Sequence, residues 1–288
     1  MKRWMLNVLT VFFAVVFLVS AGVLGKYLWD SHAQKQKQDE ISQLVDRPQT
    51  RPTGTAPTEP VQTEPGQTEE MTQPTQPEET EPPIEYEQVV NEAGETVRVL
   101  KDYAEVYRLN NDLVGWIQIP GTIIDYPVMQ KSDSVDYYLH RDIYKEYSRH
   151  GTIYVREACD VNIPSDAITI YGHRMKDGSM FAGLTAYIEE EFYKENKYIY
   201  FDTLTEYHTY EIISVFITSA HVGKGFRYHV LDMARDAAEF EEYVDTCKDL
   251  ALYETGVTAE YGEKLIVLST CDYSVRNGRL VVVAKRIS

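Results

Sequence analysis

Two apolar strands near the C-terminus, in the segment EKLIVLSTCDYSVRNGRLVVVAKR, carry side chains suited to covalent chemistry. Cys271 ends the first strand, and Arg279 opens the second after a short polar loop. The thiolate is the nucleophilic form of cysteine, and a nearby arginine, either Arg279 or Arg276, favours it electrostatically. A lone cysteine more often serves packing, which is our interpretation of Cys159 and Cys247. The position of Cys271 at a strand end makes it the candidate nucleophile.

A cysteine nucleophile needs a partner for proton transfer and a group that stabilises an oxyanion. Among the seven histidines, His173 follows the apolar strand AITIY and Gly172, so it lies where a strand meets a rim. His221 also ends a strand pattern, FITSAH, and is the rival. From the residue pattern alone, both histidines remain candidates.

The elements that must position these groups follow from short apolar runs separated by turn residues. A second pattern, with apolar residues at helical spacing, predicts helices. Eight or so strands with two or three inserted helices indicate a mainly β fold that closes, or nearly closes, into a barrel. The predicted strands are 114–121, 123–129, 151–155, 167–173, 197–202, one long or two short strands in 207–221, and two strands flanking Cys271; the predicted helices are 99–110, 179–196 and 231–253.

The N-terminal segment, residues 1–29, is predicted to be a transmembrane anchor. It contains no charged residue between Arg3 and Lys26, a run long enough to span a bilayer as a helix. The alternative is a signal peptide cleaved near Val19–Ala21, although the apolar run continues past that site. Positive charges flank the span on both sides and do not decide its orientation. We adopt an N-terminus inside the cell, because a large C-terminal domain follows the span.

Composition divides the remaining chain into three parts. Residues 30–46 form a polar stalk, and residues 47–88 are rich in Pro, Thr and Glu and are predicted to be a disordered spacer. Residues 89–288 form the predicted catalytic domain. The net charge of −17, without basic clusters, argues against a nucleic-acid partner. Three cysteines cannot form a complete disulfide framework, and no residues occur at metal-ligand spacing, so we expect neither a metal nor a cofactor.

Three segments, in their order along the chain, resemble the class B sortases. NDLVGWIQIPGTIIDYPVMQ is similar to the first two strands of that family, YGHRMKDGSMFAGL to its histidine segment, and LSTC with GRLVVVAKR to its cysteine signature. The resemblance covers about 98–288. It implies an eight-stranded sortase-like β-barrel, and it favours His173 over His221 and Arg279 over Arg276.

The resemblance implies a membrane-anchored transpeptidase of Gram-positive bacteria. Cys271 would attack a sorting signal near the C-terminus of a secreted protein to form a thioester. His173 would protonate the leaving amine, and Arg279 would hold the substrate or the oxyanion. An amine of a peptidoglycan precursor or of a pilin would then resolve the thioester. Ser269, Thr270 and Tyr171 are assigned to substrate binding.

This chain departs from the family pattern at two positions. Val267 replaces a common threonine, and Arg174 follows the histidine where asparagine is common. Asp272, the residue after the candidate nucleophile, could orient a neighbouring side chain or lie exposed in the closing loop, and we expect it to be exposed.

Two other functions remain alternatives at this point. The first is a cysteine hydrolase or endopeptidase that uses the same pair of residues and releases its product to water. The second is a tethered surface-binding domain in which Cys271 is inert. The expected location is the cell membrane, with a single span and an extracellular domain.

Overall fold

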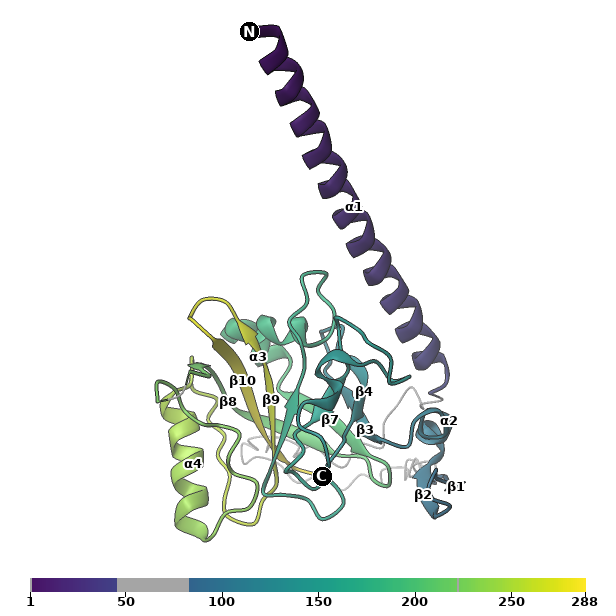
Figure 1. Ribbon diagram of the computed structural model, residues 1–288. Helices are drawn as coiled ribbons and strands as arrows, with labels where there is room; N and C mark the ends of the chain where they lie inside the picture. Colours follow the sequence, from purple (N-terminus) through teal and green to yellow (C-terminus); the bar gives the residue numbers. More distant parts are fainter. Residues whose placement is uncertain (1, 46–82, 222) are drawn as a thin grey trace, which may run out of the picture.

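The computed structural model describes residues 2–45, 83–221 and 223–288. Most of the predicted spacer therefore lies outside the described residues. Helix α1 (Lys2–Gln43) is long and apolar enough to cross a membrane. It continues without interruption into the predicted polar stalk as far as Gln43, and it projects from the rest of the protein (Figure 1).

An eight-stranded closed β-barrel forms the body of the protein and confirms the predicted fold class. The strands follow the order β10-β8-β7-β3-β4-β5-β6-β9 around the barrel, and β4–β5 and β6–β9 pair in parallel. The strands are β3 (Leu113–Gln118), β4 (Asp125–Met129), β5 (Ile153–Val155), β6 (Ala167–Tyr171), β7 (Tyr198–Thr203), β8 (Thr209–Ser219), β9 (Leu265–Asp272) and β10 (Gly278–Arg286).

The segment 207–221 forms a single long strand, β8, rather than two short ones. The segment predicted as one helix over 179–196 divides into the 3-10 helix η2 (Phe181–Ile188) and α3 (Glu190–Glu195). A short 3-10 helix, η1 (Tyr137–His140), precedes β5. A hairpin of β1 (Tyr86–Val90) and β2 (Thr96–Leu100), which begins inside the range predicted for the spacer, leads into α2 (Lys101–Leu109).

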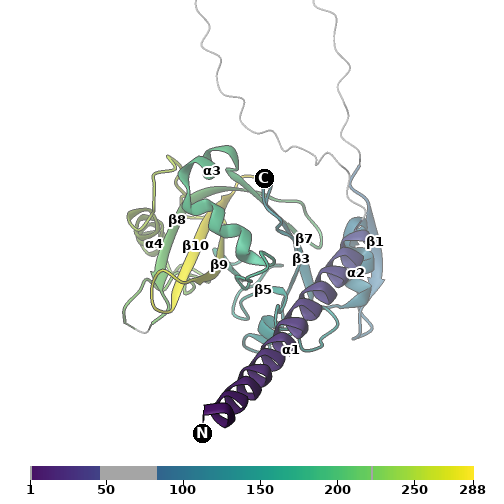
Figure 2. The same ribbon diagram turned by 90° about the horizontal axis from the view of Figure 1, so that it is seen from above.

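Helix α4 (Ala237–Asp249) begins later than predicted, where the Asp236 carboxylate accepts a hydrogen bond from the Glu239 N–H as an N-cap. Phe240 and Val244 pack on the outer face of the sheet, against Val267 of β9 and other residues of one buried cluster. Helix α4 and the group formed by α1, α2 and the β1–β2 hairpin lie on opposite sides of the barrel (Figures 1 and 2).

Successive side chains of β9 and β10 point alternately into two different hydrophobic cores. Ile266 and Leu268 face the barrel interior, whereas Leu265 and Val267 face the cluster under α4. Cys271 continues the second set, so it lies on the outer face of the barrel, beyond the end of the α4 cluster. This alternation places the candidate nucleophile at an open rim rather than inside the barrel.

Candidate active site

Strand register brings the three candidate catalytic residues into one row. Strands β6 and β9 pair Tyr171 with Ser269, and His173 and Cys271 each follow two positions later. Strands β9 and β10 pair Cys271 directly with Arg279. Because side chains two positions apart share a face of a strand, these adjacent strands present imidazole, thiol and guanidinium side by side at one end of the barrel.

A cleft of about 740 Å³ opens over this row, and His173, Cys271 and Arg279 all line it. Ser269, Thr270 and Tyr171 line it too. The chain after β8 also lines the cleft, with the rival histidine, His221, and with Tyr228. Arg276 is exposed in the β9–β10 loop and does not line the cleft.

The imidazole of His173 is held at its edge and on one of its faces. Its Nε2 atom lies 2.8 Å from the carbonyl oxygen of Leu139, and its ring stacks on His140 with 5.4 Å between centroids. A carbonyl oxygen only accepts, so Nε2 carries the proton and Nδ1 is the nitrogen available for proton transfer. Burial lowers the pKa of His173 below its ordinary value of 6.5, while the bond to Leu139 opposes this shift.

Gly172, which precedes the histidine, lies so close to neighbouring side chains that its position has no room for a Cβ atom. A Cβ atom at this position would lie 2.5 Å from the Ile153 side chain and 2.6 Å from that of Phe181. The Gly172 carbonyl oxygen accepts a hydrogen bond of 2.8 Å from the Thr270 hydroxyl. The turn that carries His173 is thus fixed to the strand that carries Cys271.

Two hydrogen-bonded tyrosines connect α4 to the lining of the cleft. The Tyr243 hydroxyl donates to the Tyr228 carbonyl oxygen at 2.6 Å, and the Tyr228 hydroxyl shares a 2.7 Å hydrogen bond with Ser269. Burial raises the pKa of Tyr228, and the charge of Arg279 opposes that shift. Sequence reasoning missed Tyr228, because it lies in an irregular segment without a motif.

The three residues assigned to substrate binding differ in burial and in the hydrogen bonds that their side chains already make. Ser269 and Thr270 are almost fully buried, and their hydroxyls already bond to Tyr228 and to the Gly172 backbone. Tyr171 is half-buried and stacks obliquely on Tyr154 with 5.5 Å between centroids. Their role in substrate binding remains a prediction.

Asp272 is buried, with 5% of its surface exposed, so the prediction that it lies exposed in the loop was wrong. Its Oδ2 atom lies 3.3 Å from a guanidinium nitrogen of Arg174, and its Oδ1 atom accepts hydrogen bonds from the backbone and hydroxyl of Ser274. An ion pair thus links Asp272, which follows the candidate nucleophile, to Arg174, which follows the candidate base.

The other two cysteines are packing residues, as predicted. Cys159 and Cys247 are buried, and burial raises the pKa of each thiol to about 12. Neither forms a nucleophilic thiolate near neutral pH. Cys271 is the half-buried member of the three free cysteines.

Comparison with known proteins identifies the family. The sortase domain family matches residues 117–287. Sortase B of Listeria monocytogenes is 35% identical over 202 residues, which cover 69% of this chain and 78% of that protein. Sortase B of Staphylococcus aureus is 28% identical over 204 residues, covering 70% of this chain and 80% of that protein.

Solved structures agree with these relatives. The complex of Bacillus anthracis sortase B with AAEK1 matches 91% of this chain and 99% of its own, with a TM-score of 0.65 and 28% identity. Clostridium perfringens sortase B matches 64% of this chain and 98% of its own, with a TM-score of 0.59 and 31% identity. With the closed barrel, these matches show that the chain belongs to the sortase family and is a class B sortase, a cysteine transpeptidase.

Proposed function

We propose that this sortase cleaves a C-terminal sorting signal of secreted proteins and transfers them to an amine of the cell wall or of a pilin. The observation that supports this most directly is the row of His173, Cys271 and Arg279 across β6, β9 and β10 at the rim of a cleft. A cleft of about 740 Å³ has room for an extended peptide beside the thiol.

The chemistry would proceed in two displacements. The Cys271 thiolate attacks the scissile carbonyl carbon, and Arg279 stabilises the negative charge on the carbonyl oxygen. As the carbon–nitrogen bond breaks, protonated His173 gives its Nδ1 proton to the leaving amine, and a thioester remains. The acceptor amine then attacks the thioester, His173 takes its proton, and the Cys271 thiolate leaves as a new amide forms.

The length and composition of helix α1 favour an enzyme that is anchored in the membrane. Its apolar part is long enough to span a bilayer, and the catalytic domain follows on its C-terminal side. We propose a single span with the barrel outside the cell, where secreted proteins and amine acceptors meet.

Mass spectrometry of the soluble domain, residues 83–288, tests the reaction. Peptides with Asn-Pro-x-Thr and Leu-Pro-x-Thr-Gly signals are incubated with the domain, with and without an added amine. We expect a covalent acyl adduct on Cys271 that the amine releases as an amide. The adduct is absent from Cys271→Ala and present in Cys247→Ala, the matched variant of a buried thiol.

The form of the product separates the rival functions. Release as the free acid at every amine concentration would indicate a hydrolase. A Cys271 thiol that neither acylates nor reacts with iodoacetamide in the folded domain would indicate an inert binding domain.

A further inference from the structure

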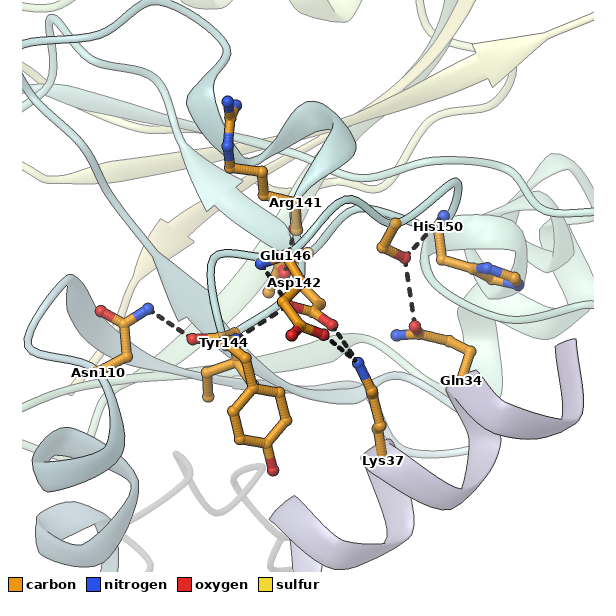
Figure 3. A network of polar contacts seen from close by, with 11 residues as sticks. Gln34, Lys37, Asn110, Arg141, Asp142, Tyr144, Glu146 and His150 are labelled. Carbon is orange, nitrogen blue, oxygen red and sulfur yellow. Dashed lines mark hydrogen bonds and ion pairs between the residues drawn. The ribbon is translucent and has the colours of Figure 1, made fainter. Parts of the chain in front are cut away.

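Helix α1 continues past its apolar part and contacts the barrel along one side. The contacts come from residues 31–41 of the predicted polar stalk, and "the stalk" below means these residues. They place polar side chains on the loop before β5 (Figure 3) and on the loop after β6. Gln38 donates to the Asp125 carbonyl oxygen at 3.1 Å, and Ile41 is buried with 4% exposed. The anchor helix and the catalytic domain therefore share an interface.

The first contact of the stalk is an ion pair with a buried carboxylate. Lys37 Nζ lies 2.6 Å from Asp142 Oδ2 and 3.3 Å from Glu146 Oε2 (Figure 3). The other oxygen of Asp142 accepts the backbone N–H groups of Tyr144 and Glu146, which closes the turn that follows η1. The Asp142 side chain is only 4% exposed, and its hydrogen bond to Lys37 raises the pKa of the lysine. Loss of this cation leaves a buried negative charge without its partner.

This turn is continuous with the group that holds the catalytic imidazole. Leu139, which accepts the hydrogen bond from His173, and His140, which stacks on it, both belong to η1, just before Asp142. The His140 carbonyl oxygen also accepts the Ser148 N–H at 3.0 Å. A shift of the turn at Asp142 therefore moves the support of His173.

The second contact of the stalk reaches the loop that carries His173 itself. The Ser31 hydroxyl donates to Asp177 Oδ2 at 2.5 Å, and His150 Nε2 lies 2.9 Å from the same oxygen. Asp177 also accepts the backbone and hydroxyl of Ser179, which closes the loop. The loop returns to His173, whose carbonyl oxygen accepts the Phe181 N–H at 2.9 Å. The stalk thus holds both segments that flank the imidazole.

We propose that the stalk of α1 is a positioning element for His173, so that full transpeptidase activity requires the anchor helix to be docked on the barrel. This inference rests on the proposed role of His173. It makes Lys37 and Ser31 positioning residues, because neither lines the cleft and each acts through a loop. The membrane anchor then tunes the reaction as well as tethering the enzyme.

Kinetics of the full chain in lipid nanodiscs test the proposal with a sorting-signal peptide and an amine. We expect Lys37→Ala to lower kcat by about 10- to 100-fold, the range for a small misplacement of a catalytic group, and to change KM little. Lys35→Ala is the matched control, because Lys35 is exposed on the same helix and alanine favours helix equally at both positions. Lys37→Arg keeps the charge toward Asp142 and should restore kcat.

Equal kcat values for Lys37→Ala and wild type would overturn the proposal. So would a loss in Lys37→Ala that Lys35→Ala matches, or one that appears in KM alone.

A second measurement needs no peptide, so it separates failure of this inference from failure of the proposed function. Hydrogen exchange should quicken in 137–152 for Lys37→Ala and in 173–181 for Ser31→Ala, but not for Lys35→Ala. Alkylation of Cys271 by iodoacetamide should slow in the same two variants, because a mobile imidazole stabilises the thiolate less well. If the wild type cleaves no peptide, the proposed function fails; unchanged exchange and alkylation in both variants would refute the docking argument independently.

Discussion

The ion pair between Arg174 and Asp272 allows a quantitative test of how the two halves of the active site are joined. The perturbation is Arg174→Met, which keeps most of the apolar stem and removes the charge. Asp272 keeps its hydrogen bonds to Ser274 but loses its counter-ion inside the protein. A buried carboxylate left without a cation destabilises the folded state.

The magnitude follows from the separation and the exposure of the pair. Two unit charges 3.3 Å apart attract by about 5 kcal/mol at an effective dielectric constant of about 20. Desolvation offsets much of this, because the Asp272 side chain is 4% exposed, whereas 29% of the Arg174 side chain remains in water. We therefore expect Arg174→Met to lower the free energy of unfolding by about 2 kcal/mol, a value between those typical of surface and of buried ion pairs. This loss corresponds to a decrease of about 4–8 °C in Tm.

Urea unfolding of the soluble domain, together with the double variant Arg174→Met/Asp272→Asn, measures this loss. Asparagine still accepts the Ser274 hydrogen bonds but needs no counter-ion, so the double variant should regain about 1 kcal/mol relative to Arg174→Met. An Arg174→Met domain within about 0.5 kcal/mol of wild type, which is the range of ordinary surface substitutions, would refute the reasoning. A further loss on adding Asp272→Asn would refute it equally.

Three other predictions concern the supports of the site. Acidification should destabilise the soluble domain, because burial lowers below 6.5 the pKa of His173 and of His208, a buried histidine between β7 and β8 that lies outside the cleft. The unfolded chain binds more protons there, so the stabilisation is complete above about pH 6.5 and is lost as the pH falls through the lowered pKa values; urea midpoints that rise on acidification would contradict this. Gly172→Ala should cost about 1–3 kcal/mol by overpacking and lower kcat, measured by thermal unfolding and peptide cleavage; an unchanged Tm would refute the close contacts. Tyr228→Phe should cost about 1 kcal/mol by removing the hydrogen bond to Ser269, which urea unfolding checks; no loss would show that this bond adds no stability.

The barrel could be predicted from sequence because its strands are short apolar runs between turn residues. The β1–β2 hairpin could not, because YEQVV and TVRVL are short and mix polar with apolar residues, and the first adjoins a proline-rich segment. Strand β1 is held in position by its packing against α2, a contact that the local sequence pattern does not reveal.

The row formed by His173, Cys271 and Arg279 could be expected from motif order, but its supports could not. Asp272 is a charged residue beside a polar loop, which favours exposure in any local interpretation. Strand alternation instead turns it to the side opposite Cys271, where Arg174 meets it from 98 residues away in sequence. Only the register of β6 against β9 creates that pair. The contacts of the stalk were hidden for the same reason, since each joins residues more than 80 positions apart.

The end of α1 and the start of β1 pack against the same hydrophobic cluster. Val45 and Tyr86 pack against the same buried group, which contains Ile41 and Val89. The Pro- and Thr-rich segment between them therefore leaves and rejoins the domain at one place. In the proposed single-span topology, the height of the cleft above the membrane is then set by the helical rise of α1, about 1.5 Å per residue, and not by the length of that segment. Doubling the length of a loop adds only about 0.6 kcal/mol to the cost of closing it, so in this topology the number of residues between Val45 and Tyr86 would not change the distance of the active site from the bilayer.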